Sequence, residues 1–265
     1  MHPTVKLRGG AEMPMLGLGV WQMAAGSETE QAVEWALEAG YRLVDTASLY
    51  RNEQSVGAAL RRSSLPRHEV FVTTKLLPQH TNAATELQRS LERLGLDYVD
   101  LYLIHWPIPL FASRAWRRLA ALQEQGLARA IGVSNYGRGR LKRLVDGRSP
   151  PAANQVQFNP FRFRRRLLEY CEEHGIVFEA YSPLARGKGL ENPVVTELAR
   201  RLERTPAQVL LRWAIQHGAV VIPKSSHADR IRSNAQVFDF ELDDDDMRQL
   251  DALDRTHGTS RAYLP

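Results

Sequence analysis

Three titratable side chains end successive strand-like segments of this 265-residue chain. Asp45 follows the apolar pair Leu43 and Val44, Lys75 ends the next such segment, and His105 follows the one after that. The carboxyl ends of parallel strands lie on one face of a sheet or barrel, where loops build active sites. Taken singly, each residue type is often structural, as a turn-forming aspartate, a surface lysine or a core histidine. Their occurrence in order at equivalent strand ends favours a common site.

Tyr50 adds an acid to this group, five residues after Asp45. A free phenol has a pKa near ~10, and a nearby ammonium lowers that pKa. With Lys75 as the ammonium and Asp45 holding Lys75 in place, we expect Tyr50 to protonate an oxyanion as it forms. His105 can donate a hydrogen bond to the same oxygen. Such a set suits carbonyl reduction or its reverse, and it offers no nucleophile for hydrolysis.

Strands and helices must alternate to bring these side chains together, and the pattern predicts that they do. A hairpin with a glycine turn, over residues 5–7 and 12–13, comes first and is expected to cap one end of the main sheet. Eight mostly apolar strands follow, which indicates burial on both faces. The strands are predicted over residues 15–19, 42–44, 70–74, 99–104, 130–133, 154–157, 176–180 and 219–222. The helices are predicted over residues 28–39, 55–62, 83–94, 115–125, 140–145, 167–174, 194–202, 206–217, 230–237 and 243–253.

Eight strand–helix units close naturally into a (β/α)8 TIM barrel, which places the chain in the α/β class. The hairpin is then an N-terminal cap, and the surplus helices lie near the C-terminus. No linker rich in proline or serine divides residues 1–265, so we expect one domain. The stretch from Gly17 to Gly19 lacks the third glycine of a dinucleotide fingerprint, and Lys188, between two glycines, lacks the rest of a phosphate loop. No spacing typical of metal ligands is present, so no metal is expected.

Composition narrows the class of protein. The chain has 43% hydrophobic residues, a net charge of +5 and one cysteine, Cys171, which excludes an intrachain disulfide. We expect a cytoplasmic protein with no membrane segment, because the sequence shows neither a signal peptide nor a long apolar run. The arginines of residues 162–166 are more typical of a solvated helix start than of a nucleic-acid surface. No heptad or apolar strip suggests more than a monomer.

Several motifs together resemble those of the aldo-keto reductase family. They run in the family's order from about Gly17 to Asn234, and the resemblance implies a (β/α)8 barrel that binds NADPH without a Rossmann fold. The matching segments are residues 45–53, 73–75, 103–107, 132–136, 154–156, 181–184 and 222–225.

The resemblance implies a role for each matching residue. Tyr50 would be the proton donor, and the tetrad would be completed by Asp45, Lys75 and His105. Ser134, Asn135 and Gln155 would hold the nicotinamide carboxamide, while Tyr181 would stack on the nicotinamide ring. Further cofactor contacts would come from Gly19, Val20, Trp21, Asp45, Ser182 and Leu184. Lys224, Ser225 and Arg230 would clamp the adenosine 2′-phosphate, with Asn234 at the adenine. A cation at a strand end and an arginine at the next helix start also suit a phosphate on physical grounds.

Departures from the family pattern bear on the substrate. Arg51 stands where many members have glycine, and its guanidinium near the pocket mouth would favour acidic or polyhydroxylated substrates. The segment after Trp106 and the tail of residues 255–265 are short, so we expect an open pocket. This form is similar to bacterial members that reduce 2,5-diketo-gluconate, methylglyoxal and other small dicarbonyls. The expected pocket walls are Trp21, Tyr50, His105 and Trp106.

Two rival functions stay open at this stage. One is a cofactor-sensing subunit on the same barrel, which the intact tetrad disfavours because a sensor need not keep proton-transfer chemistry. The other is a basic nucleic-acid binder, which no motif in the sequence supports.

Overall fold

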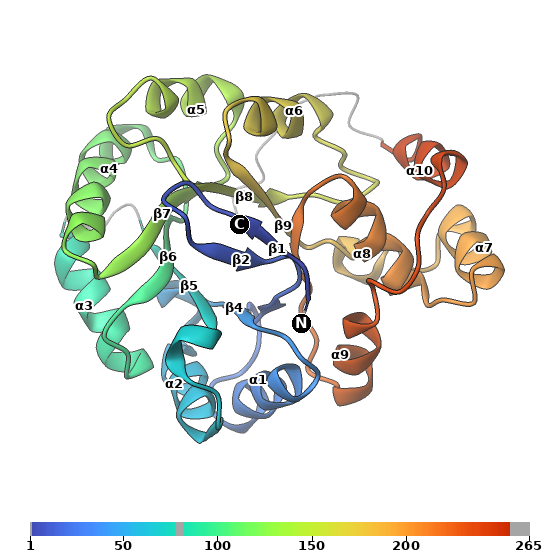
Figure 1. Ribbon diagram of the computed structural model, residues 1–265, viewed down its shortest axis with the longest axis horizontal. Helices are drawn as coiled ribbons and strands as arrows, with labels where there is room; N and C mark the ends of the chain where they lie inside the picture. Colours follow the sequence, from blue (N-terminus) through green and yellow to red (C-terminus); the bar gives the residue numbers. More distant parts are fainter. Residues whose placement is uncertain (1, 78–81, 255–265) are drawn as a thin grey trace.

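The computed structural model describes residues 2–77 and 82–254, with the side chains of residues 109–113 left aside. Eight parallel strands form the inner wall of a barrel, and helices surround it (Figure 1). Each strand pairs with the next in sequence from β3 to β10. The ring closes where Leu16 bridges Val221 and where the Gly17 amide donates to the Val221 carbonyl at 2.9 Å. The predicted (β/α)8 fold is therefore confirmed.

The strands are β3 (Leu18–Gly19), β4 (Leu43–Asp45), β5 (Phe71–Leu76), β6 (Val99–Ile104), β7 (Ala128–Ser134), β8 (Ala153–Gln157), β9 (Val177–Tyr181) and β10 (Val220–Ile222). The helices are α1 (Ser27–Glu38), α2 (Glu53–Arg62), α3 (Ala83–Leu94), α4 (Pro109–Glu124), α5 (Arg138–Val145), α6 (Arg165–Glu173), α7 (Pro193–Arg201), α8 (Pro206–Gln216), α9 (Ala228–Ala235) and α10 (Asp244–Asp251). Short 3₁₀ helices are η1 (Ser48–Tyr50), η2 (Arg67–Glu69) and η3 (Ala185–Gly187). Within the described residues, no helix is long and apolar enough to span a bilayer.

The N-terminal hairpin caps the barrel, as predicted. Its strands β1 (Thr4–Lys6) and β2 (Glu12–Pro14) pair antiparallel and lie across one end of the barrel in Figure 1. Leu7 and Met13 are buried there in a cluster with side chains of the barrel interior, including Leu43 and Val220. The amino ends of the strands are thus covered by hydrophobic contact, and active sites of this fold lie at the opposite end of the barrel.

Alternation along the strands decides which polar side chains enter the barrel. In β5, Phe71 packs in the interior cluster, while Val72 and Leu76 pack in the outer cluster beneath the helices. The period of two therefore turns Lys75 inward. The same alternation turns Asp45 inward, because Leu43 faces the interior and Val44 faces the helices.

One helix boundary differs clearly from the prediction. Helix α4 begins at Pro109 rather than at residue 115, with proline at a first-turn position where its fixed φ suits a helix. The connection after Trp106 is correspondingly short, as expected. The other predicted boundaries differ from the structure by at most three residues. The short C-terminal tail, residues 255–265, lies outside the described residues.

Candidate active site

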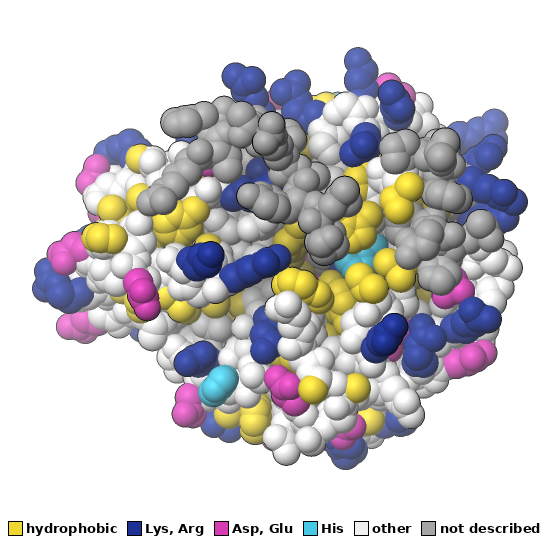
Figure 2. Space-filling view, turned by 180° about the vertical axis from the view of Figure 1, so that it is seen from behind, with side chains coloured by type: hydrophobic (Ala, Val, Ile, Leu, Met, Phe, Trp, Pro, Cys, Tyr) yellow, Lys and Arg dark blue, Asp and Glu magenta, His cyan; other side chains and the backbone are white. Residues whose placement is uncertain are grey.

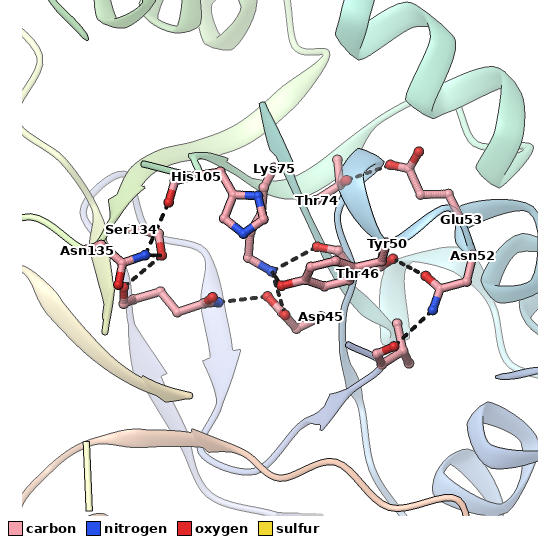
Figure 3. Close-up of polar contacts among 12 residues, drawn as sticks. Asp45, Thr46, Tyr50, Asn52, Glu53, Thr74, Lys75, His105, Ser134 and Asn135 are labelled. Carbon is pink, nitrogen blue, oxygen red and sulfur yellow. Dashed lines mark hydrogen bonds and ion pairs between the residues drawn. The ribbon is translucent and has the colours of Figure 1, made fainter. Parts of the chain in front are cut away.

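Lys75 is the centre of the polar group at the carboxyl end of the barrel (Figure 3). Its side chain has no exposed surface, and its Nζ donates to Asp45 Oδ1 at 2.6 Å, to the Thr46 carbonyl at 2.9 Å and to Tyr50 Oη at 3.2 Å. An ammonium has three N–H donors, and these three acceptors use all of them. Since Tyr50 Oη accepts from Lys75, the phenol keeps its own proton to donate elsewhere.

Tyr50, which would donate that proton, lies beside His105. Tyr50 lies half-buried in η1, and His105 follows β6 directly, with their ring centroids 5.7 Å apart in an edge-on arrangement. The Trp106 ring stacks against His105 at 5.9 Å. Trp21 lies after β3, and the Arg186 guanidinium stands 5.1 Å from its ring centroid. Hydrophobic side chains and a histidine also gather near the middle of the face opposite the hairpin, between Lys and Arg side chains (Figure 2).

Burial changes the titration of these groups in a way that the sequence did not predict. Lys75 does lower the pKa of Tyr50, but desolvation outweighs it and raises that pKa to about 12. The expected net lowering of the Tyr50 pKa is therefore wrong for the free protein, in which the phenol holds its proton. Desolvation alone would lower the pKa of Lys75, but the charges of Asp45 and Tyr50 raise it above its ordinary value. Desolvation raises the pKa of Asp45, against the contrary effect of Lys75.

His105 is a neutral imidazole throughout the physiological range. Desolvation, followed by repulsion from the Lys75 ammonium, lowers its pKa to about 3. Its Nδ1 is buried and has no hydrogen-bond partner among the described residues. A neutral histidine keeps one N–H, so it can donate a hydrogen bond to a developing oxyanion without becoming a competing acid.

Amide and hydroxyl groups lie beside this acid. Gln155 Nε2 donates to Asp45 Oδ2 at 2.7 Å, and Ser134 Oγ donates to the Gln155 carbonyl at 2.9 Å. Asn135 Nδ2 donates to the His105 carbonyl at 3.2 Å, while Asn135 Oδ1 accepts from Tyr181 Oη at 2.9 Å. The half-buried Tyr181 ring could stack on an aromatic ring, and the neighbouring two amides and hydroxyl could hydrogen-bond a carboxamide on that ring. These residues fit the nicotinamide of a dinucleotide.

The segment after β10 carries two cationic side chains, Lys224 and Arg230, apart from the group around Lys75. Lys224 and Arg230 are exposed, with Arg230 in the first turn of α9, while Ser225 and Asn234 are buried. Exposed cations at a helix start fit a phosphate group. Backbones approach closely between this segment and β3, because a Cβ on Gly19 would meet the Ile222 carbonyl at 2.8 Å. Val20 is buried, whereas Ser182 and Leu184 after β9 are half-buried.

Left-handed backbone concentrates at this end of the barrel. Of the described non-glycine residues with positive φ, all but Glu203 come after the ends of β3, β4, β7 and β9. They are Gln22, Arg51, Asn135, Ser182, Ala185 and Arg186. Such conformations persist only where the surrounding structure imposes them, and they cluster at functional sites.

Known proteins resemble this chain along nearly its whole length. The model of the aldo/keto reductase family matches residues 15–255. The glyoxal reductase of Bacillus subtilis is 45% identical over 259 residues, covering 96% of this chain and 94% of that protein. The methylglyoxal reductase DkgA of Yersinia pestis is 47% identical over 262 residues, covering 96% and 94%. A crystal structure of an aldo/keto reductase from Brucella melitensis superposes with a TM-score of 0.90 at 41% identity, covering 96% of this chain and all of that one.

This chain belongs to the aldo/keto reductase family. Its sequence resemblance to that family is thereby confirmed, and with it an oxidoreductase that uses a nicotinamide cofactor. Among the described residues of this aldo/keto reductase, no three potential ligands gather as they would around a metal ion.

The sequence missed polar residues that hold this aldo/keto reductase site in shape. Asn52 is buried, and its Nδ2 donates to the Val20 carbonyl at 2.9 Å, while its Oδ1 accepts from Thr46 Oγ1 at 3.0 Å. It therefore ties the loop that carries Trp21 to the loop that carries Tyr50. Asn52 precedes α2, where asparagine is normally read as a helix cap, but its side chain makes no cap bond. No pattern in the sequence distinguished these two uses.

Proposed function

We propose that this protein reduces small aldehydes, ketones and dicarbonyls to alcohols, with Tyr50 as the proton donor. One observation carries the proposal: Lys75 Nζ donates its three hydrogen bonds to Asp45, Thr46 and Tyr50. Because Tyr50 Oη accepts one of them, its own hydroxyl hydrogen can be donated to a substrate. A nicotinamide cofactor would supply the hydride. The developing alkoxide takes its proton from Tyr50 Oη while the neutral His105 donates a second hydrogen bond to it.

The cofactor proposed is NADPH. Ser134, Asn135 and Gln155 would hold its carboxamide, and Tyr181 would cover one face of its ring. Support comes from the hydrogen bonds that already link these four residues to one another or to the tetrad. Further contacts are proposed from Gly19, Val20, Trp21, Asp45, Ser182, Leu184 and Asn234.

Lys224, Ser225 and Arg230 are proposed as the clamp for the 2′-phosphate that distinguishes NADPH from NADH. Lys224 and Arg230 are exposed, and the carboxylate of Glu28 stands 3.9 Å from Lys224 Nζ. Replacing Arg230→Gln would remove one charge-assisted contact, worth about 1.5–3 kcal/mol, and so raise the NADPH dissociation constant roughly tenfold to a hundredfold. Fluorescence titration measures this directly. NADH affinity should not change, and Arg232→Gln on the same exposed helix serves as the matched control.

A small dicarbonyl is the proposed substrate class. The relatives named as glyoxal and methylglyoxal reductases support it, as do the aromatic walls offered by Trp21, Tyr50, His105 and Trp106. The exposed Arg51 next to Tyr50 supports an additional preference for acidic or polyhydroxylated carbonyls.

NADPH consumption tests the proposal against methylglyoxal, 2,5-diketo-gluconate and aromatic aldehydes. We expect turnover, and we expect Tyr50→Phe to reduce it by about a hundredfold to ten-thousandfold, the usual contribution of a general acid. The variant retains the ring that packs against His105. Full activity of Tyr50→Phe would refute the proton-donor role, and no turnover of any substrate would refute the proposed function.

A further inference from the structure

A second carboxyl group lies inside the barrel below the proposed tetrad. Glu179 occupies the middle of β9, in register with Gln155 on β8 and Val220 on β10, and has no exposed surface. Its strand neighbours Val177 and Tyr181 pack with the interior cluster, so alternation points Glu179 into the barrel as well. No step of the proposed reduction uses this group.

Both carboxyl oxygens of Glu179 lack a hydrogen-bond partner among the described residues. The buried Glu53 makes the contrast clear, because Thr74 Oγ1 donates to it at 2.6 Å and Arg93 Nε at 2.7 Å. An ionised carboxylate that is fully buried and makes no hydrogen bond of good geometry is very unfavourable, so such a group keeps its proton. The site around Lys75 then contains one carboxylate, that of Asp45, for one ammonium.

The groups facing Glu179 show what its ionisation would do. Asp45 comes from β4, Lys75 from β5 and Gln155 from β8, while β10 presents the apolar Val220. Desolvation, reinforced by repulsion from Asp45, raises the pKa of Glu179 to about 8, against the contrary effects of Gln155 and Lys75. Gln155 and Lys75 are also the two residues whose side chains donate to Asp45.

We propose that Glu179 is a positioning residue of this site, whose carboxyl group must carry a proton for Lys75 and Gln155 to stay on Asp45. Once ionised, Glu179 repels Asp45 and competes for both of its donors. Lys75 is the partner of Tyr50, and Gln155 is a proposed carboxamide ligand, so ionisation disturbs the proton donor and the cofactor site together. This inference rests on the proposed function for its catalytic consequence, but the titration of Glu179 can be tested without it.

The pH profile of reduction provides the catalytic test. For one ionisation near pH 8, kcat/KM should fall about tenfold between pH 7 and pH 9, and neither Tyr50 nor His105 titrates in that interval. Glu179→Gln is isosteric and cannot ionise, so its profile should be flat over the same interval. Glu53→Gln, the matched buried glutamate, should keep the wild-type fall. The same fall in Glu179→Gln, or no fall in the wild type, would overturn the proposal.

Thermal unfolding provides a test that needs no turnover. The folded-state pKa of Glu179 lies above its unfolded value of about 4.3, so the wild type should lose stability as pH rises between these values. The melting temperature of Glu179→Gln relative to wild type should therefore climb from pH 5 to pH 9. A constant difference would overturn the proposal even in an active enzyme. If Glu179→Gln does not fold, Glu179→Leu fills the same space without an ionisable group and serves in both tests. If no substrate is turned over, the proposed function fails, and the unfolding result still tests whether Glu179 carries a proton in the folded protein.

Discussion

Replacing Asp45 by asparagine should destabilise the protein strongly at neutral pH. The Lys75–Asp45 pair is separated by 2.6 Å, and the two side chains are 0% and 3% exposed. Removing one partner of such a pair typically costs about 3–5 kcal/mol, because a buried charge is left uncompensated. The alternative for the variant is to release the Lys75 proton, and bringing a lysine pKa from about 10.4 down to 7 costs about 5 kcal/mol as well. Both routes give the same range, equivalent to a fall of about 10 °C in melting temperature.

The pH dependence of that loss identifies its cause. In the wild type the pKa of Lys75 is raised, so its stabilising contribution is complete below the unfolded pKa and disappears only as pH rises beyond the folded one. In Asp45→Asn the pKa of Lys75 should fall below the unfolded value, so the stability of the variant should increase with pH. The difference between the two proteins should therefore shrink from pH 7 to pH 10.

Urea unfolding followed by tryptophan fluorescence at pH 7, 8.5 and 10 measures both effects. The double variant Asp45→Asn, Lys75→Met is the control, since it removes both members of the buried pair and should be more stable than Asp45→Asn alone. A loss below about 1 kcal/mol at pH 7 in Asp45→Asn, or a loss independent of pH, would refute this account of the pair.

Three further predictions follow from single positions. In α2, Gly57→Ala should destabilise the protein by more than about 2 kcal/mol in urea unfolding, because its Cβ would collide with the Leu94 carbonyl. The control Gly139→Ala in α5 meets nothing within 4 Å and should stabilise the protein by about 0.5–1 kcal/mol. Arg51→Gly should relax the left-handed backbone at φ 58° and lower kcat/KM for acidic carbonyls relative to neutral ones; an unchanged ranking would count against a substrate role for Arg51. The folded-state pKa of His105 is depressed, so the stability of the wild type should fall as pH drops from about 6.5 toward 3. His105→Gln should lose less stability than the wild type over that interval, which urea unfolding at successive acidic pH values measures.

The sequence by itself determined the barrel and its active end. Apolar strands in regular alternation with helices can bury both of their faces in only a few folds. For eight such strands, the (β/α)8 barrel is the fold that does so. The positions of Asp45, Lys75 and His105 at strand ends then placed them on one face, and the structure brings Asp45, Lys75 and Tyr50 within hydrogen-bond distance. The family motifs added the order of the cofactor segments.

Only the tertiary structure decided the electrostatics and the supporting contacts. The Tyr50 pKa follows from the balance between desolvation and the Lys75 charge, and burial cannot be measured along a chain. Asn52 stands where a helix cap is common, and only the structure shows that its partners lie in the loops after β3 and β4. Glu179 lies in an apolar strand, and no sequence pattern around it indicates a role in the site. Its proximity to Asp45 and Gln155 arises only when β4, β8 and β9 curve around one interior.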